Sequence, residues 1–167
     1  MDITIERAKP SDAAEILTYL RQVGGETDNL TFGPEGLSFG VEAEEAYLSG
    51  IENSRDEIML IARENKKIVG VSSLNRLPRR MSHRGDFGVS VVKSHWNRGI
   101  GSRLLENILA LAKENGFEII DLQVRSDNAA AIHLYEKYGF RKLCTYPAFF
   151  KIGIRPVDFE LMCLKLD

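Results

Sequence analysis

Two glycines near the middle of the chain have the spacing of an anion-binding turn. They lie in the stretch HWNRGIGSRLL at positions 95–105. Gly99 and Gly101 precede leucines that recur at helical spacing, so the pair marks the N-terminus of a predicted helix. A helix N-terminus presents unpaired N–H groups and a partial positive charge, and both attract phosphate. Because glycine has no Cβ, a ligand can approach its backbone closely. These residues therefore predict a phosphate cradle, to which Arg98 and Arg103 would add positive charge.

Glycine pairs before a helix also occur in two well-defined nucleotide-binding loops. A Walker A loop is excluded, because it requires a Gly-Lys pair and the chain has none. A dinucleotide-binding fingerprint would place an acidic residue about 20 positions further on, near Asp121, but Leu104 stands where its third glycine is needed. These residues alone do not exclude a third interpretation, in which the glycines only turn the chain from strand to helix and bind no ligand.

A second group of residues that could bind a ligand or take part in a reaction lies in the next predicted helix. Tyr135 follows Asn128 by seven residues, which is two helical turns, so both side chains lie on one face. Considered singly, Asn128 is also explained as a plain helix N-cap, and Tyr135 as a half-buried core aromatic.

Together the two stretches resemble the signatures of the GNAT N-acetyltransferase superfamily. The first signature, V-x-x-x-x-[Q/R]-x-x-G-x-[G/A], is similar to residues 91–101, VVKSHWNRGIG. The second, N-x-x-A-x-x-[L/F]-Y-x-x-x-G-F, fits Asn128, Ala131, Leu134, Tyr135, Gly139 and Phe140. Trp96 departs from the first signature, where Gln or Arg is usual. Asn97 stands where glycine is frequent, and asparagine is the other residue that best tolerates left-handed backbone.

The resemblance implies acetyl-CoA as co-substrate. Its pyrophosphate is expected on the backbone amides of Arg98, Gly99, Ile100, Gly101 and Ser102. The pantetheine arm is expected to pair with free backbone groups of Val91 and Val92 between two splayed strands, and with the side chain of Asn128. The cofactor site is completed by Trp96, Asn97, Ala131 and Tyr135. No His, Cys or carboxylate pair has metal-ligand spacing, so no metal is expected.

The reaction implied by the resemblance is direct attack of a neutral amine on the acetyl thioester, through a tetrahedral intermediate. Tyr135 is the expected general acid for the departing thiolate, and the amide of Val92 or its neighbour is expected to polarise the thioester carbonyl. The general base stays open between Asp86, Glu26, Glu42 and water. Two histidines, His95 and His133, are expected on the surface.

The expected acceptor is a free amino acid or another small amine, with a polyamine and a protein N-terminal amine as alternatives. Residues 79–88 resemble the same strand of bacterial relatives that acetylate free amino acids or other small amines, and an arginine there could bind an α-carboxylate. A polyamine would instead need a pocket lined by carboxylates, for which Glu42, Glu44 and Glu45 are available. A protein N-terminal amine, as on a ribosomal protein, is the third acceptor, and a non-catalytic CoA-binding module is the non-enzymatic alternative.

The elements that must position these residues follow the order βαα-βββ-α-β-α-ββ in one domain, residues 1–167. This predicts a mixed α/β (α+β) fold with a splayed, mostly antiparallel sheet flanked by helices. Strands are expected at residues 3–8, 57–63, 67–74, 86–92, 118–124, 140–146 and 157–166, with an insert at 147–156. Helices are expected from a Ser11 cap to Gly24-Gly25 and over residues 41–51, 101–115 and 128–138. In the second helix, Ala43, Ala46, Tyr47 and Ile51 are expected to form the inner face, opposite the glutamates.

Composition narrows the classes of partner. The net charge of −2 gives no basic field for nucleic acid or an anionic membrane, and no apolar run approaches the roughly 20 residues of a membrane span. The N-terminus shows no signal pattern, and Cys144 and Cys163 are interpreted as core thiols, so a reducing, cytoplasmic location is expected. A homodimer through a sheet edge is possible, with the apolar residues 146–152 either in that interface or in the acceptor pocket.

Overall fold

Seven strands form a single mixed sheet in the computed structural model, which describes residues 2–167. The strands are β1 (Ile3–Arg7), β2 (Glu57–Glu64), β3 (Lys67–Arg76), β4 (Arg84–Val91), β5 (Ile119–Arg125), β6 (Arg141–Ile152) and β7 (Arg155–Lys165). The helices are α1 (Ala13–Glu26), α2 (Val41–Ile51), α3 (Ile100–Glu114) and α4 (Ala129–Lys137). The predicted element order and the mixed, mostly antiparallel fold class are confirmed.

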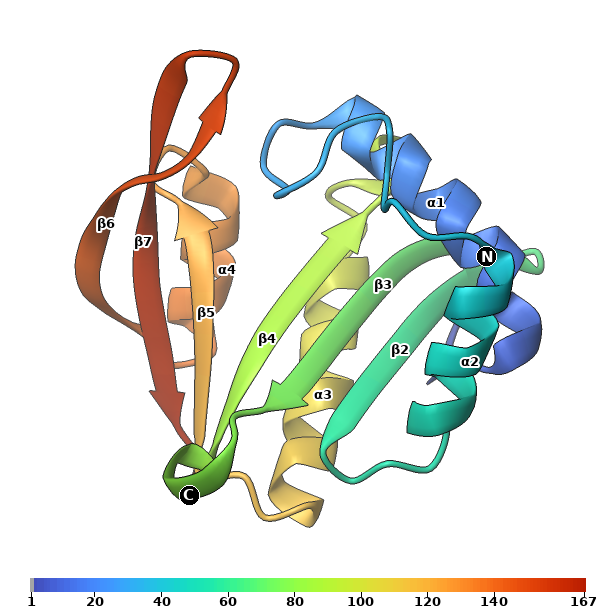
Figure 1. The fold of residues 1–167 in the computed structure, drawn as a ribbon. Coiled ribbons are helices and arrows are strands. Elements are labelled where there is room, and N and C mark those ends of the chain that lie inside the picture. Colours follow the sequence, from blue (N-terminus) through green and yellow to red (C-terminus); the bar gives the residue numbers. More distant parts are fainter. Residues whose placement is uncertain (1) are drawn as a thin grey trace.

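The sheet is antiparallel throughout except where β4 and β5 meet. Its strand order is β1-β2-β3-β4-β5-β7-β6, and only the β4–β5 pair is parallel. That pair covers three residue pairs, from Arg84↔Ile119 to Asp86↔Asp121, after which the two strands diverge. Figure 1 shows the opening between the upper parts of β4 and β5. The expected splay is therefore present in the middle of the sheet.

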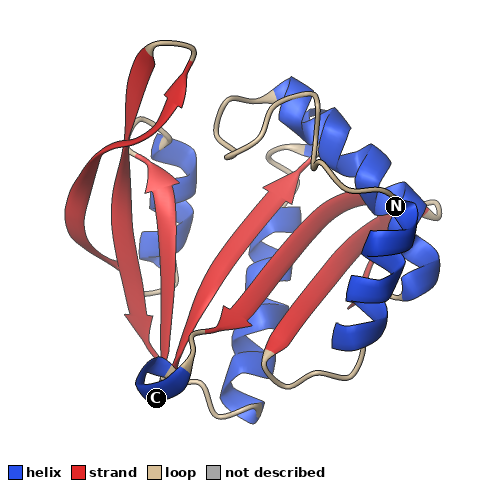
Figure 2. Ribbon diagram, viewed as in Figure 1, coloured by secondary structure: helices blue, strands red, loops and turns tan. Residues whose placement is uncertain are grey.

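The helices cover opposite faces of this sheet. Helices α1 and α2 lie in front of β2, β3 and β4, while α3 packs behind them (Figures 1 and 2). The inner stripe of α3 is fully buried and consists of Ile100, Leu104, Leu105, Ile108 and Ala112. This spacing is the helical one that the sequence showed, and it fixes the start of α3 against the sheet.

The inner face of α2 differs from the prediction. Glu44, Leu48 and Ile51 are buried, whereas Ala43 and Tyr47 are exposed. The buried positions have the i, i+4, i+7 spacing of one helical stripe. Leu48 and Ile51 are the largest aliphatic side chains of the helix, and directing both into the core brings Glu44 inward with them. Exposing an alanine costs little hydrophobic free energy, so the alanines do not determine the orientation of the helix.

Two further predictions about the elements are wrong. The first helix is preceded by a 3₁₀ turn over Pro10–Asp12, and the carboxylate of Asp12, not the side chain of Ser11, accepts from the backbone N–H of Lys9 at 2.8 Å. The expected insert at 147–156 is not a separate segment. It continues the β6–β7 hairpin beyond an irregularity between Tyr146 and Phe150. Aromatic residues suit a half-buried pleated surface, which explains why the strand persists there.

Strand β6 is an edge of the sheet, and this position explains the outcome for the cysteines. Cys144 on β6 is exposed and Cys163 on β7 is half-buried, so the interpretation of Cys144 as a core thiol is wrong. Alternating side chains of an edge strand face solvent unless another element covers them. Dimerisation through this edge stays a prediction. Within residues 2–167, no helix is both long and apolar enough to cross a membrane.

Candidate active site

The divergence of β4 from β5 exposes backbone groups of β4. The N–H of Val92 donates to the carbonyl of Val69 at 3.0 Å, and the N–H of Leu77 donates to the carbonyl of Arg84 at 2.9 Å. Backbone groups alternate along a strand, so even-numbered residues of β4 bond to β3 and odd-numbered residues face the other way. Val89 and Val91 therefore direct their N–H groups into the opening, beyond the last residue paired with β5.

This pattern corrects one predicted residue. Val92 has no free backbone group, because its N–H bonds to Val69 and its carbonyl accepts from the N–H of His95 at 2.9 Å. Its side chain is also buried. The expected pairing of Val92 with a cofactor arm, and the use of its amide on a thioester, are therefore wrong. The carbonyl of Val91 accepts from the indole N–H of Trp96 at 2.8 Å, which leaves its N–H facing the opening.

The N-terminus of α3 is built as the glycine pair predicts. Gly99 is the N-cap in left-handed conformation, with φ of 76°, and Asn97 also has a positive φ, of 60°. No side chain caps the helix, and the first internal hydrogen bond runs from the N–H of Arg103 to the carbonyl of Gly99 at 3.1 Å. The amides of residues 100–102 therefore have no partner inside the helix. They are donors ready for an anion.

A cavity of about 400 Å³ lies over these amides. Its lining includes Val91, Trp96, Asn97, Gly99, Ile100, Gly101, Ser102, Asn128 and Ala131, all of which were predicted. A Cβ on Gly101 would have only Leu134 Cδ2 nearby, at 3.8 Å, and a Cβ on Gly99 would have no atom within 4 Å. A Cβ at either position would therefore clash with no protein atom, and a larger side chain would project into open space. The fit to a phosphate-bearing ligand is good.

Arg98 does not line this cavity, because its side chain pairs with Glu64 at the end of β2. One carboxylate oxygen of Glu64 accepts from Arg98 Nη2 at 2.6 Å, and the other lies 2.7 Å from His95 Nε2. These hydrogen bonds lower the pKa of Glu64 to about 2. The side chain of His95 is only 16% exposed, so its expected surface position is wrong. Glu64 thus fixes the loop before α3 at two points.

Sequence reasoning missed Glu64. Its partners lie 31 and 34 residues further along the chain, and no local pattern connects them. His133, in contrast, is exposed as expected.

Helix α4 carries the second predicted pair, of which Asn128 lines the smaller cavity and Tyr135 lies outside its lining. The side-chain oxygen of Asn128 caps the helix by accepting from the N–H of Ala131 at 3.3 Å, so its NH₂ group stays available as a donor. Tyr135 is 7% exposed, and its ring packs against Phe87 and Phe140, with centroids 6.3 and 5.7 Å away. Burial raises the pKa of Tyr135 to about 12, so its hydroxyl stays protonated. This is the state that a proton donor requires.

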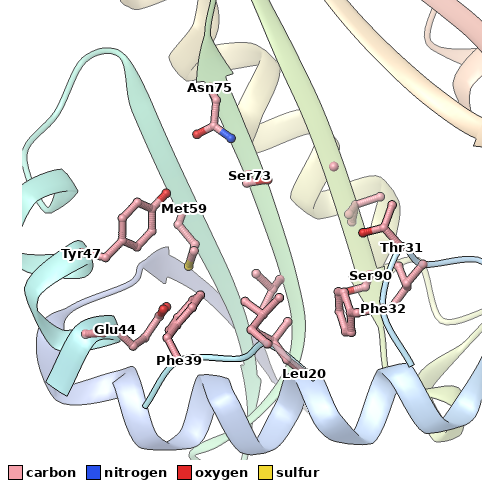
Figure 3. A pocket seen from close by; sticks show the side chains of 16 residues that line it. Leu20, Thr31, Phe32, Phe39, Glu44, Tyr47, Met59, Ser73, Asn75 and Ser90 are labelled. Atoms are coloured by element: carbon pink, nitrogen blue, oxygen red, sulfur yellow. The ribbon is translucent and has the colours of Figure 1, made fainter. Parts of the chain in front are cut away.

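A larger cavity, of about 750 Å³, lies on the α1–α2 face of the sheet. Its apolar and aromatic lining comprises Leu20, Leu30, Phe32, Leu37, Phe39, Ala43, Tyr47, Met59, Val71 and Val89 (Figure 3). The loop at 27–40 closes one side, and it approaches α1 so closely that a Cβ on Gly24 would lie 2.0 Å from the carbonyl oxygen of Gly33. Leu30, Val89 and Ser90 line this cavity and the smaller one. The two cavities therefore meet at β4.

Polar groups in the larger cavity are few. They are Thr31, Glu44, Ser73, Asn75 and Ser90, together with the hydroxyl of Tyr47. No lysine, arginine or histidine is among the described lining residues. The predicted arginine for an α-carboxylate is therefore absent from the lining: Arg79, Arg80 and Arg84 all lie outside it, and Arg84 is held by Asp121 at 2.7 and 2.8 Å.

The three candidate bases differ in position. Asp86 lies on the same face of β4 as Gly88 and pairs in register with Asn75, two residues that line the larger cavity. Burial raises the pKa of Asp86, and Gln123 donates a hydrogen bond to it at 3.2 Å. Glu42 is exposed and lies outside the lining.

Glu26, the third candidate base, ties the end of α1 to the turn after β4. One of its oxygens accepts from the Gln22 side chain at 2.9 Å, and the other from the backbone N–H of Lys93 at 2.7 Å. Both oxygens are thus engaged. Within residues 2–167, no three His, Cys, Asp or Glu side chains gather as they would around a metal ion.

Comparisons with known proteins agree with this geometry. The L-amino acid N-acetyltransferase AaaT of Escherichia coli strain K12 is 43% identical over 65 residues, 38% of this chain and 39% of that protein. The ribosomal protein bS18-alanine N-acetyltransferase of the same strain is 38% identical over 56 residues, 34% of this chain and 38% of that protein. The chain thus aligns with about two fifths of the length of these curated relatives.

A solved structure matches over the whole chain. The GNAT-family acetyltransferase of Streptococcus pneumoniae superposes with a TM-score of 0.94 at 32% identity, covering 99% of this chain and 100% of that one. The sequence pattern of the acetyltransferase (GNAT) family, whose members use acetyl-CoA, matches residues 28–140, more than half of the chain and most of the residues that line the two cavities. The chain therefore belongs to the acetyltransferase (GNAT) family.

Proposed function

We propose that this protein transfers the acetyl group of acetyl-CoA to a small primary amine. The observation that carries the proposal is the meeting of two unlike cavities at Val89 and Ser90. One cavity has the uncapped N-terminus of α3, which suits phosphates. The other is mainly apolar and has the volume of a small-molecule site. A donor and an acceptor held in the two cavities would be adjacent along β4.

Several groups of this chain are suited to hold acetyl-CoA, which supplies an activated acetyl thioester. The amides of residues 100–102 suit its pyrophosphate, and the N–H groups of Val89 and Val91 suit its amide-containing arm. The NH₂ group of Asn128 is a further donor on the facing helix. Backbone donors of this kind are fixed in place before the ligand arrives, so little ordering is needed on binding.

Two side chains are assigned to proton transfer. An amine is protonated at neutral pH and must lose a proton before it attacks. Asp86, directly or through water, accepts that proton, since a raised pKa makes a carboxylate a better base. Tyr135 donates to the leaving sulfur, because its buried hydroxyl is protonated and lies on the helix that begins at Asn128.

The acceptor is assigned to the larger cavity. Small amines are the first class to test, with free amino acids among them because one relative is named an L-amino acid N-acetyltransferase. A protein N-terminal amine is the second class, since another relative is named for an alanine of a ribosomal protein. A volume of about 750 Å³ that is closed on one side by the loop at 27–40 favours a small molecule over a protein.

The test begins with thermal unfolding in the presence and absence of acetyl-CoA. Thiol release is then measured with amino acids, alkylamines, polyamines and peptides with free N-termini. A rise in Tm together with release on small amines is the expected result. A rise in Tm with release on the peptides alone would replace the acceptor class. A rise without release on any amine would favour a CoA-binding module, and no rise would remove the cofactor assignment.

A further inference from the structure

Helix α2 places one carboxylate inside the larger cavity. Glu44 is 3% exposed and belongs to the lining, whereas Glu42 and Glu45 on the same helix face solvent. Figure 3 shows the carboxylate of Glu44 pointing from α2 toward Phe39 and Met59. Of the three glutamates available for a carboxylate-lined pocket, the fold has brought one to the cavity.

The side chain of Glu44 has no partner among the described residues. Its backbone N–H donates to the carbonyl of Gly40, but no hydrogen bond or ion pair joins its carboxylate to another described group, and burial is the one cause that raises its pKa. Glutamates are almost never this buried unless they are paired. An apolar residue would fill the same place on the buried stripe with Leu48 and Ile51 at no such cost. The carboxylate is therefore available to a ligand.

The chemistry around Glu44 selects the kind of ligand. Phe39 and Tyr47 provide aromatic rings, and no basic side chain lines the cavity within the described chain. A cation is attracted both by a carboxylate and by the faces of aromatic rings. A ligand carboxylate would instead be repelled by the carboxylate of Glu44 and would find no basic side chain in the lining.

The position of Glu44 identifies which part of the ligand it reaches. In Figure 3, Glu44 lies on the side of Met59, and Ser90 lies on the opposite side beyond Leu20. Met59 pairs with Ser73 and Ser73 pairs with Gly88, so the cavity spans β2, β3 and β4. Two inter-strand spacings amount to roughly 10 Å. Glu44 thus lies on the β2 side of the cavity, away from the transfer point proposed at β4.

We propose that Glu44 binds a second cationic group of the acceptor, which is therefore a diamine or polyamine with an apolar spacer and not a free amino acid with an unpaired α-carboxylate. This inference rests on the proposed function and specifies its substrate class. Glu44 acts on specificity and does not touch the reacting atoms.

The experiment compares three acceptors with the same six-carbon chain: hexylamine, 1,6-diaminohexane and 6-aminohexanoate. The wild-type protein should prefer the diamine over hexylamine by at least about 10-fold in kcat/KM, beyond the twofold that two equivalent amines provide, and should use 6-aminohexanoate least. Glu44→Gln should lower kcat/KM for the diamine by about 10-fold or more, mainly through KM, and change hexylamine by less than about 3-fold. Glu45→Gln, on the exposed side of α2, is the matched control and should change none of the three.

The outcomes separate the inference from the function on which it rests. Equal use of hexylamine and the diamine by the wild-type protein would overturn the role of Glu44 while supporting a small-amine acetyltransferase. An equal fall for all three acceptors in Glu44→Gln would show that the residue is only structural. Acetyl-CoA affinity of the variant should match the wild type and its Tm should not fall, because Glu44 has no side-chain partner to lose and its burial disfavours the charged form. No transfer to any small amine would overturn the proposed function and the inference with it.

Discussion

The two cavities that meet at β4 are built from different parts of the chain. The smaller one uses backbone amides at the start of α3, helped by Asn128 at the start of α4, and most of its lining belongs to two short stretches of sequence. The larger one collects side chains from α1, the loop at 27–40, α2 and three strands. A phosphate-bearing ligand can be held by backbone geometry, whereas the occupant of the larger cavity must be recognised by side chains.

This difference has a consequence for substitutions. A backbone cradle is sensitive to any side chain that fills it and insensitive to most changes nearby, because its donors belong to no side chain. A cavity of side chains responds one residue at a time, and each response depends on the ligand. Substitutions in and around the two cavities test that distinction.

Gly101→Val should abolish measurable acetyl-CoA binding by calorimetry. A side chain at this position projects into the smaller cavity, and its Cβ has only Leu134 Cδ2 nearby, at 3.8 Å, so the free protein should fold normally. Gly99→Val should have the same effect on binding, but the left-handed φ of 76° at Gly99 adds backbone strain. Gly50→Val, on the exposed side of α2, is the control for a valine with open space around it. Unchanged affinity in Gly101→Val would disprove the phosphate cradle.

Tyr135→Phe should lower kcat by about 100-fold and leave acetyl-CoA affinity unchanged, because it removes the proton donor and keeps the ring. The packing against Phe87 and Phe140 is preserved, so Tm should not fall. Tyr138→Phe on the following turn, whose hydroxyl bonds to Glu106, is the comparison variant and should retain full turnover. If both variants turn over like the wild type, Tyr135 has no part in proton transfer.

Asp86→Asn should lower kcat/KM by about 10- to 100-fold and change its pH profile. Burial raises the pKa of Asp86, so the wild-type rate should fall as pH drops through a value above the ordinary 3.8, where the base becomes protonated. The variant should lack this acidic limb. Glu26→Gln tests the rival base and should keep the limb, because both Glu26 oxygens already accept hydrogen bonds. Loss of the limb in Glu26→Gln alone would transfer the role to Glu26.

Glu64→Gln should weaken acetyl-CoA binding by only a few fold, since it loosens the loop without touching the amides. It should also lower Tm near neutral pH. The pKa of Glu64 is depressed to about 2 from an ordinary 4.5, so its stabilising effect is present above pH 4.5 and is lost as pH falls toward 2. The difference in Tm between the two proteins should therefore shrink over that interval. Glu57→Gln, exposed on the same strand, should show no such dependence.

Much of the fold could be predicted because its signals are local. The leucine stripe of α3, the glycine just after it and the apolar runs of β2 and β3 are all contained in short stretches of the chain. Errors arose where the answer depends on a distant neighbour. The exposure of Cys144 follows from the place of β6 at the sheet edge, and the inward turn of Glu44 follows from how Leu48 docks.

The sequence by itself determined the family, the element order and the glycine turn at the start of α3, because the signals for each lie within a few residues of one another. The tertiary structure alone decided that Val92 is engaged with β3, that Glu64 anchors Arg98 and His95, and that the larger cavity holds Glu44 without any arginine. The physical reason is that burial and pairing are properties of the packed chain. Whether a charged side chain is paired depends on which strand or helix packs against it. The two partners are often far apart in the sequence, so no short stretch contains both.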